Sequence, residues 1–230
     1  RLFTIETVYD NGEPQKDLIA INAGHPTEVH PHTLKAIDEQ LVVDVEGQSD
    51  ILISGIANRA ECYSKFSLIN PILVANQAMA NTVMQFQQMP LVREGGIAII
   101  AHPLTAQFDR RRFAPYVEFF EELMAQELDP YWLWENYVED FAHRPEYVYG
   151  YRYAHAYHGS HPFFMWNSTA VPRQYLSKIY FAGVRDRSAA RRCGFEAFPT
   201  VEDAIEAAEA ELGSDASITL MQRPPQFIPR

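Results

Sequence analysis

Two short apolar runs, joined by a long segment without charge, constrain the fold of this chain more than any other feature. Residues 51–54 and 97–101 are continuous stretches of aliphatic and small side chains. Such runs are typical of strands buried on both faces of a parallel sheet. Between them, Asn70-Pro71 is typical of a helix N-cap followed by proline, and the helix is expected to run to about Gln88. The segments therefore predict a strand–helix–strand unit with a right-handed crossover.

The predicted helix has an unusual composition, because no charged residue occurs between Phe66 and Val92. A membrane span is disfavoured by Pro71 and by the asparagines and glutamines along the segment. Two interpretations remain. The helix is buried between the sheet and a neighbouring domain, as nearly all-round apolar helices usually are, or some of its amides face a ligand cleft.

The remaining elements complete an α/β pattern. Alternation, helical spacing and turn residues predict a hairpin from 2–8 and 17–22, a helix at 33–40, strands at 41–45, 178–182 and 217–221, and helices at 116–126, from 129 onward, at 188–193 and at 201–212. Residues 145–176 are aromatic-rich and irregular, either a packed subdomain or a binding region. We expect a mostly parallel sheet with helices on both faces, plus an irregular aromatic-rich helical subdomain.

Composition narrows the possible partners. The 230 residues have a formal net charge of −11, and no block of lysine and arginine offers a phosphate footprint, because the arginines at 110–112 and 185–192 are local and sit beside acidic residues; nucleic acid is therefore not an expected partner. Two cysteines, Cys62 and Cys193, do not form a disulfide framework, and the sequence contains neither a signal peptide nor a membrane span, which favours a cytoplasmic protein. The chain begins at Arg1 and enters directly on a predicted strand, so we expect it to be part of a longer protein.

The residues that follow the two buried strands are the best candidates for a functional site. In open α/β sheets, ligands bind beyond the carboxyl ends of the strands. Gly55 and Asn58 follow the first strand, and His102 follows the second. His102 is predicted to be a general acid/base that titrates near its ordinary pKa. The alternative is a structural histidine at a strand end, held by the turn at Pro103.

Further candidates lie before and within the charge-free helix. Lys65, with Tyr63 close by, precedes the helix, and Asn76 lies near its start, so both can reach the edge that carries Gly55 and His102. The helix N-terminus also favours a substrate carboxylate. An isolated lysine at such a position is otherwise usually solvated.

The other histidines allow two interpretations. His155, His158 and His161 are spaced by three residues, but Gly159 interrupts any regular element and no cysteine or carboxylate completes a ligand set nearby. They form a mononuclear metal site or are loop histidines bonded to the backbone; we predict no metal site. The early histidines at positions 25, 30 and 32 could reach the same sheet edge.

In order along nearly the whole chain, several segments resemble the C-terminal domain of the lactate racemase family, the nickel-pincer 2-hydroxyacid racemases and epimerases. The matching segments are 23–25 with His30, Ser49–Gly55, Arg93–Ile100, 159–161 and Phe198–Ile205. The resemblance implies inversion of an α-hydroxy acid, in which a nickel-pincer nucleotide accepts hydride from the carbinol carbon. It also implies an N-terminal domain, absent from this chain, whose histidines move the hydroxyl proton and which anchors the cofactor.

For this domain the resemblance implies one wall of the interdomain substrate cleft. The assigned residues are Tyr63, Lys65 and His102 as catalytic groups and Gly55, Asn58, Asn76 and His161 as substrate-binding groups. If residues 69–70 match the family's helix start, its Tyr-Gln pair falls on Ile72 and Leu73 and its substrate lysine on Asn76. This departure supports an alternative function, a non-catalytic binding or regulatory domain. In either case we expect this chain alone to hold no cofactor and to be inactive.

Overall fold

The computed structural model describes residues 2–10, 17–56, 70–84, 90–222 and 227–230. The chain forms two compact units, residues 1–47 with 225–230 and residues 48–224. In the part of the chain that the structure describes, no helix has both the length and the apolar character needed to cross a membrane.

The smaller unit is a hairpin packed on one helix. Strands β1 (Thr4–Tyr9) and β2 (Leu18–Gly24) are antiparallel, as predicted from their alternation and from the turn between them. Helix α1 (Pro26–Leu41) buries Val29 and Thr33. Strand β3 (Val42–Val43) pairs in parallel with β9 (Ile228–Pro229).

Helix α1 begins seven residues before the predicted start at Thr33, so the expected loop through His30 and His32 is helical. Pro26 occupies the first helical turn, where its missing N–H costs nothing, and Pro31 is accommodated in the second turn. His30 Nδ1 lies 3.2 Å from a carboxylate oxygen of Glu6 on β1. The early histidines therefore belong to the smaller unit.

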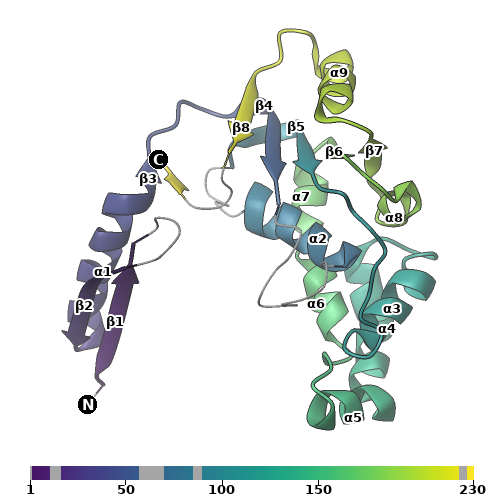
Figure 1. Cartoon of the computed structure of the whole chain (residues 1–230), viewed down its shortest axis with the longest axis horizontal. Helices are drawn as coiled ribbons and strands as arrows, with labels where there is room; N and C mark the ends of the chain where they lie inside the picture. The colour runs from purple at the N-terminus through teal and green to yellow at the C-terminus, as the bar shows by residue number, and fades with distance from the viewer. Residues whose placement is uncertain (1, 11–16, 57–69, 85–89, 223–226) are drawn as a thin grey trace. The chain divides into compact units, whose positions relative to one another are not determined.

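The larger unit is built on a five-stranded sheet in the order β7-β6-β5-β4-β8, with every neighbouring pair parallel (Figure 1). The strands are β4 (Ser49–Gly55), β5 (Val92–Ala101), β6 (Lys178–Ala182), β7 (Glu196–Phe198) and β8 (Ile218–Met221). The prediction that residues 51–54, 97–101 and 179–182 are neighbouring parallel strands is confirmed.

Helices cover the sheet, in agreement with the predicted α/β class. Helix α9 (Val201–Leu212) packs Ala204 and Ala208 against Ile53 and Ile99 on one face. The residues between them in the strands, Leu52, Ala98, Ile100 and Phe181, are also buried, as expected for strands covered on both sides. Thr200 and Asp203 form a capping box that fixes the start of α9.

The charge-free segment forms helix α2 (Pro71–Ala78), which continues as a π-helical turn from Met79 to Val83. The Asn70 side-chain oxygen accepts hydrogen bonds from the N–H groups of Ile72 and Leu73, both at 3.1 Å, which confirms the predicted N-cap. Seven of the eight residues of α2 are buried. The predicted burial of the helix is therefore confirmed for Pro71–Ala78, whereas the glutamines at 85, 87 and 88 lie outside the described residues.

The aromatic-rich region between β5 and β6 is a helical subdomain. It contains α3 (Ala114–Glu118) with a π-helical turn (Phe119–Leu123), α4 (Pro130–His143), α5 (Pro145–Tyr153), α6 (His161–Asn167) and α7 (Ala170–Tyr175). Helix α8 (Arg187–Arg192) lies between β6 and β7. Gly159 lies against α4 so closely that a Cβ there would be 1.9 Å from the carbonyl oxygen of Phe141. Only glycine allows this approach.

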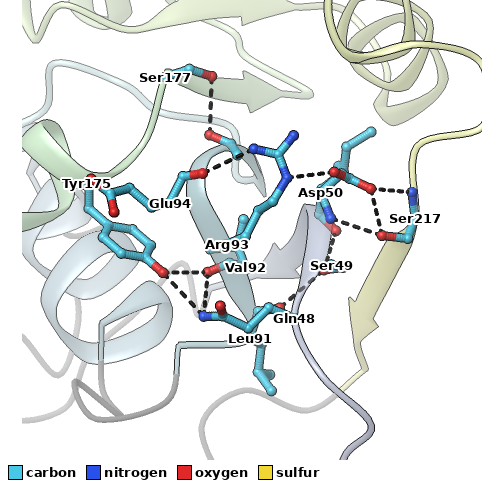
Figure 2. Close-up of polar contacts among 12 residues, drawn as sticks. Gln48, Ser49, Asp50, Leu91, Val92, Arg93, Glu94, Tyr175, Ser177 and Ser217 are labelled. Atoms are coloured by element: carbon cyan, nitrogen blue, oxygen red, sulfur yellow. Dashed lines mark hydrogen bonds and ion pairs between the residues drawn. The ribbon is translucent and has the colours of Figure 1, made fainter.

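The amino end of the sheet carries a bulge. Ser49 pairs with Val92 and Ile51 with Ile97, so Asp50 alone stands opposite the four residues 93–96 of β5. The Arg93 Nε–H donates to the Asp50 carboxylate at 2.6 Å, and Ser217 at the start of β8 donates to the same carboxylate (Figure 2). The Gly-Gly motif that precedes the apolar run thus forms a bulge that brings three strands together.

Candidate functional site

Gly55 and His102 lie on neighbouring strands at the carboxyl edge of the sheet. Gly55 pairs with Ala101, the residue before His102. The backbone N–H of His102 donates to the Ala182 carbonyl at 3.1 Å, which extends the ladder between β5 and β6 by one residue. These contacts place the backbone of His102 at the edge where parallel sheets bind ligands.

The turn after β5 fixes the His102 side chain. Its Nδ1 accepts a hydrogen bond from the N–H of Leu104 at 3.0 Å, and Leu104 is fully buried with φ of 29°. The turn after β6 holds the turn after β5 in place, because the Arg185 N–H donates to the Pro103 carbonyl at 2.8 Å. A non-glycine residue with positive φ persists only where its surroundings hold it.

The remaining imidazole nitrogen of His102 is the unusual atom of this site. Because Nδ1 is an acceptor, Nε2 carries the proton of the neutral ring. Nε2 is buried and has no hydrogen-bond partner among the described residues. A buried donor without a partner costs about 1–3 kcal/mol. The site therefore presents one N–H whose hydrogen bond remains to be made.

Burial determines the protonation state of His102. The side chain is only 4% exposed, and removal from water lowers the pKa of the imidazole to about 4. This differs from the expected titration near the ordinary pKa of histidine. At neutral pH the ring is uncharged. His102 can therefore donate a hydrogen bond from Nε2, but it is not an imidazolium that could give up a proton as a general acid.

Asn76 occupies a structural position in α2. Its Nδ2 donates to the Ser168 hydroxyl at 2.7 Å, and its side-chain oxygen lies 3.4 Å from Asn81 Nδ2. The Ser168 hydroxyl in turn donates to the Met165 carbonyl at the end of α6. The Asn76 amide thus links α2 to the helical subdomain. Ile72 and Leu73, where the family resemblance places its Tyr-Gln pair, are fully buried.

The three late histidines lie in the loop between α5 and α6 and at the start of α6. The buried Tyr116 hydroxyl makes a short hydrogen bond with His161 Nδ1, and His158 Nδ1 lies 2.8 Å from the Ser160 hydroxyl. Burial, followed by the nearby His158, lowers the pKa of His161. The side-chain partners of His158 and His161 are thus hydroxyl groups rather than the backbone carbonyls expected for loop histidines. Among the residues placed in the structure, no three histidine, cysteine or acidic side chains could together hold a metal ion.

Three predicted site residues, Asn58, Tyr63 and Lys65, lie outside the described residues. Their roles stay predictions from the sequence. The structure also reveals a cluster that the sequence interpretation missed, namely Arg112, Tyr116 and Tyr157 around His161. The only local signal for it was the density of tyrosine and histidine in residues 147–161.

Comparison with known proteins identifies the fold. No protein-family model and no curated protein matches the sequence. Among solved structures, the lactate racemase apoprotein from Thermoanaerobacterium thermosaccharolyticum is similar with a TM-score of 0.53 and 14% identity, over 99% of this chain and 46% of that chain. A Thermotoga maritima protein from a structural genomics consortium has a TM-score of 0.47 and 10% identity, over 99% of this chain and 48% of that chain. This chain thus spans less than half the length of either structure.

Proposed function

We propose that this chain is the C-terminal half of a lactate-racemase-like isomerase that inverts an α-hydroxy acid. In this proposal the chain forms one wall of the substrate cleft, and an N-terminal half of the same protein forms the other. The fold similarity to the lactate racemase apoprotein supports the proposal. The observation that carries it is the unpartnered Nε2–H of His102 at the carboxyl edge of the sheet.

His102 is assigned a hydrogen bond to an oxygen of the hydroxy acid. A neutral imidazole suits this role, because a buried N–H donates strongly and burial keeps the ring from binding a proton at neutral pH. Gly55, beside Ala101 on the neighbouring strand, has no side chain to block the approach of a ligand to this edge. Lys65 is proposed to pair with the substrate carboxylate, with Tyr63 and Asn58 beside it.

Cofactor binding is assigned to the other half of the protein. The described residues contain no group of three metal-ligating side chains, so they do not fit a nickel site. A nickel-pincer nucleotide, if it takes part, is therefore held by the proposed N-terminal half, and the residues of this chain bind and orient the substrate. His161 remains proposed as a substrate contact from the helical subdomain.

A second candidate function is a non-catalytic binding or regulatory domain derived from the same fold. The observation that favours it is the use of Asn76. Its amide is hydrogen-bonded to Ser168 and links two parts of the structure. With Ile72 and Leu73 also buried, none of the three positions implied by the resemblance is exposed to a ligand.

The test measures interconversion of D- and L-2-hydroxy acids by chiral chromatography, with the full-length protein loaded with nickel-pincer nucleotide. We expect interconversion of at least one hydroxy acid. The informative variant is His102→Asn, because the asparagine oxygen can accept the Leu104 N–H in the same turn but carries no group at the position of Nε2. Its kcat/KM should fall by about 10- to 100-fold, the loss expected for a hydrogen bond to a charged group.

The control is His143→Asn, which alters an exposed histidine on α4 that pairs with Glu139. Its kcat/KM should equal that of the wild type. If the loaded protein interconverts no hydroxy acid but binds one in calorimetry, the binding-domain function is correct and the isomerase proposal is wrong. If His102→Asn has full activity, His102 has no part in the site.

A further inference from the structure

A groove of about 540 Å³ lies between α5, the loop that follows it and the start of α6. Helix α5, which borders it, lies at the end of the helical subdomain away from strands β4 and β5 in Figure 1. Its main lining side chains are Arg112, Tyr151, His155, Tyr157, His158 and His161. Among the described lining residues none is acidic, although the chain as a whole has a net charge of −11. The groove therefore combines a cation, imidazoles and aromatic rings in an otherwise acidic protein.

Arg112 provides the positive charge of the groove. Its guanidinium has no carboxylate partner within the described ranges, whereas the neighbouring Arg110 pairs with Glu121 at 2.7 Å. The backbone of Arg112 is held on both sides, because its N–H donates to Asp109 Oδ1 at 3.2 Å and its carbonyl accepts the Tyr157 N–H at 2.9 Å. A fixed backbone carrying an unpaired guanidinium is suited to bind an anion.

The histidines add hydrogen-bond donors beside Arg112. His158 Nδ1 accepts from the Ser160 N–H at 3.3 Å, so its Nε2 carries the proton of the neutral ring. His155 is exposed and lies in a turn with φ of 53°. The turn is held by two hydrogen bonds to the Gly150 carbonyl, from Ala154 and Ala156 at 2.9 and 3.1 Å. The donors thus lie on an ordered loop, which lowers the entropy cost of binding.

Aromatic rings form the other part of the groove. The Tyr157 ring stacks on Phe113 with centroids 4.6 Å apart and contacts the His161 ring at 4.8 Å. Tyr151 packs edge-on against His158 at 5.2 Å. These contacts hold two ring walls in place. Such walls favour a planar organic group over a small hydrated ion.

We propose that this groove binds a small organic anion that carries a carboxylate or phosphate on a planar ring. The acidic group pairs with Arg112 and accepts hydrogen bonds from His155 and His158, and the ring packs on Tyr151 and Tyr157. The inference does not rest on the isomerase proposal, because neither Gly55 nor His102 is among the described residues that line the groove; His161 lines it and is named by both proposals, and no variant in the test below alters it.

The test is calorimetric titration of the chain with four probes: benzoate, phenyl phosphate, benzamide and inorganic phosphate. Benzoate or phenyl phosphate should bind saturably, and the stronger of the two identifies the acidic group. Benzamide lacks the charge and inorganic phosphate lacks the ring, so each should bind at least about fivefold more weakly. Saturable binding by neither ring-bearing anion, or equal binding of benzamide, contradicts the proposal.

Matched variants locate the binding. Arg112→Gln and Tyr151→Leu should each weaken the better probe by about fivefold. Arg110→Gln removes a guanidinium that is paired outside the groove, and Tyr153→Leu removes an exposed ring of α5 that does not line it. Both controls should leave the affinity unchanged, as should His102→Asn. An equal loss in Arg110→Gln and Arg112→Gln would show nonspecific attraction and overturn the proposal. Melting temperatures identify any variant that fails to fold, and for such a variant Arg112→Lys is measured in addition.

Discussion

The Asp50 carboxylate accepts hydrogen bonds from both the backbone N–H and the hydroxyl of Ser217, at 2.8 and 2.7 Å. Asp50 lies near the start of β4 and Ser217 directly precedes β8, so one side chain joins two neighbouring strands that are the first and the last of this sheet along the chain (Figure 2). The hydroxyl and N–H of Ser217, followed by the Arg93 guanidinium, lower the pKa of Asp50 to about 2. The folded protein therefore favours the ionised carboxylate.

Replacing this carboxylate should change the acid stability of the protein. The folded-state pKa of Asp50 lies below its ordinary value of 3.8, so the stabilisation is present above pH 4 and is lost as the pH falls toward 2. Asp50→Asn should lower the urea midpoint at pH 7 and reduce the loss of stability between pH 4 and 2. Urea unfolding followed by circular dichroism at both pH values measures this. Asp215→Asn, in the exposed loop before β8, should leave the profile unchanged.

His102 should contribute a second pH dependence in a higher range. Its pKa is about 4 when folded and 6.5 ordinarily, so the unfolded chain binds more protons between these values. Stability should therefore fall as the pH decreases from 6.5 to 4, by at most about 3 kcal/mol for this group. His102→Asn should remove this slope, and His143→Asn should retain it. An unchanged slope in His102→Asn would show that the folded imidazole binds protons normally.

Asn76 and Ser168 should be energetically coupled. Their hydrogen bond of 2.7 Å joins α2 to the helical subdomain. Replacing either residue by alanine removes this bond. Asn76→Ala should destabilise the fold by about 1–3 kcal/mol, because it leaves the packed Ser168 hydroxyl without the hydrogen-bond donor that Asn76 supplies. In a double-mutant cycle with Ser168→Ala, the coupling should be about 1 kcal/mol. Additive losses would mean that Asn76 acts on stability through other contacts.

Gly159 should tolerate no side chain. A Cβ would lie 1.9 Å from the Phe141 carbonyl oxygen, so Gly159→Ala must displace the loop from α4. We expect a loss of about 3 kcal/mol. The matched control is Gly183→Ala, where φ is 73° but a Cβ would meet no described atom within 4 Å. That variant should lose only about 1–2 kcal/mol, the cost of a left-handed backbone. Thermal unfolding of both variants distinguishes crowding from backbone strain.

The sheet was predictable because its strands have continuous apolar runs. Ile51–Ile53 and Ile97–Ile100 are buried on both faces. Strands buried in this way require uninterrupted apolar residues, which are visible directly in the sequence. The predicted N-cap at Asn70 was similarly local, because it depends only on Asn70 and the proline that follows it. The bulge opposite Asp50 was not predictable, because it depends on a partner strand more than 40 residues away.

The helical subdomain was harder to predict for a physical reason. Its helices α5, α6 and α7 are short, contain internal or initial prolines, and are held by aromatic packing rather than by an amphipathic repeat. For the candidate site, the position of His102 followed from the strand before it. Its tautomer and lowered pKa did not, because they depend on the buried turn at Leu104 and on the neighbouring turn that holds it.

The place of β8 beside β4 has a consequence for biosynthesis. During translation β4, which ends at Gly55, emerges well before the strand that covers one of its edges, which begins only at Ile218. Until then, the nascent chain presents an apolar strand with an open row of backbone donors and acceptors. Such a late, long-range pairing slows folding and favours aggregation of incomplete chains. Nascent chains stalled before Ser217 should therefore depend on chaperones that bind exposed strands, and release from them should follow synthesis of residues 218–221.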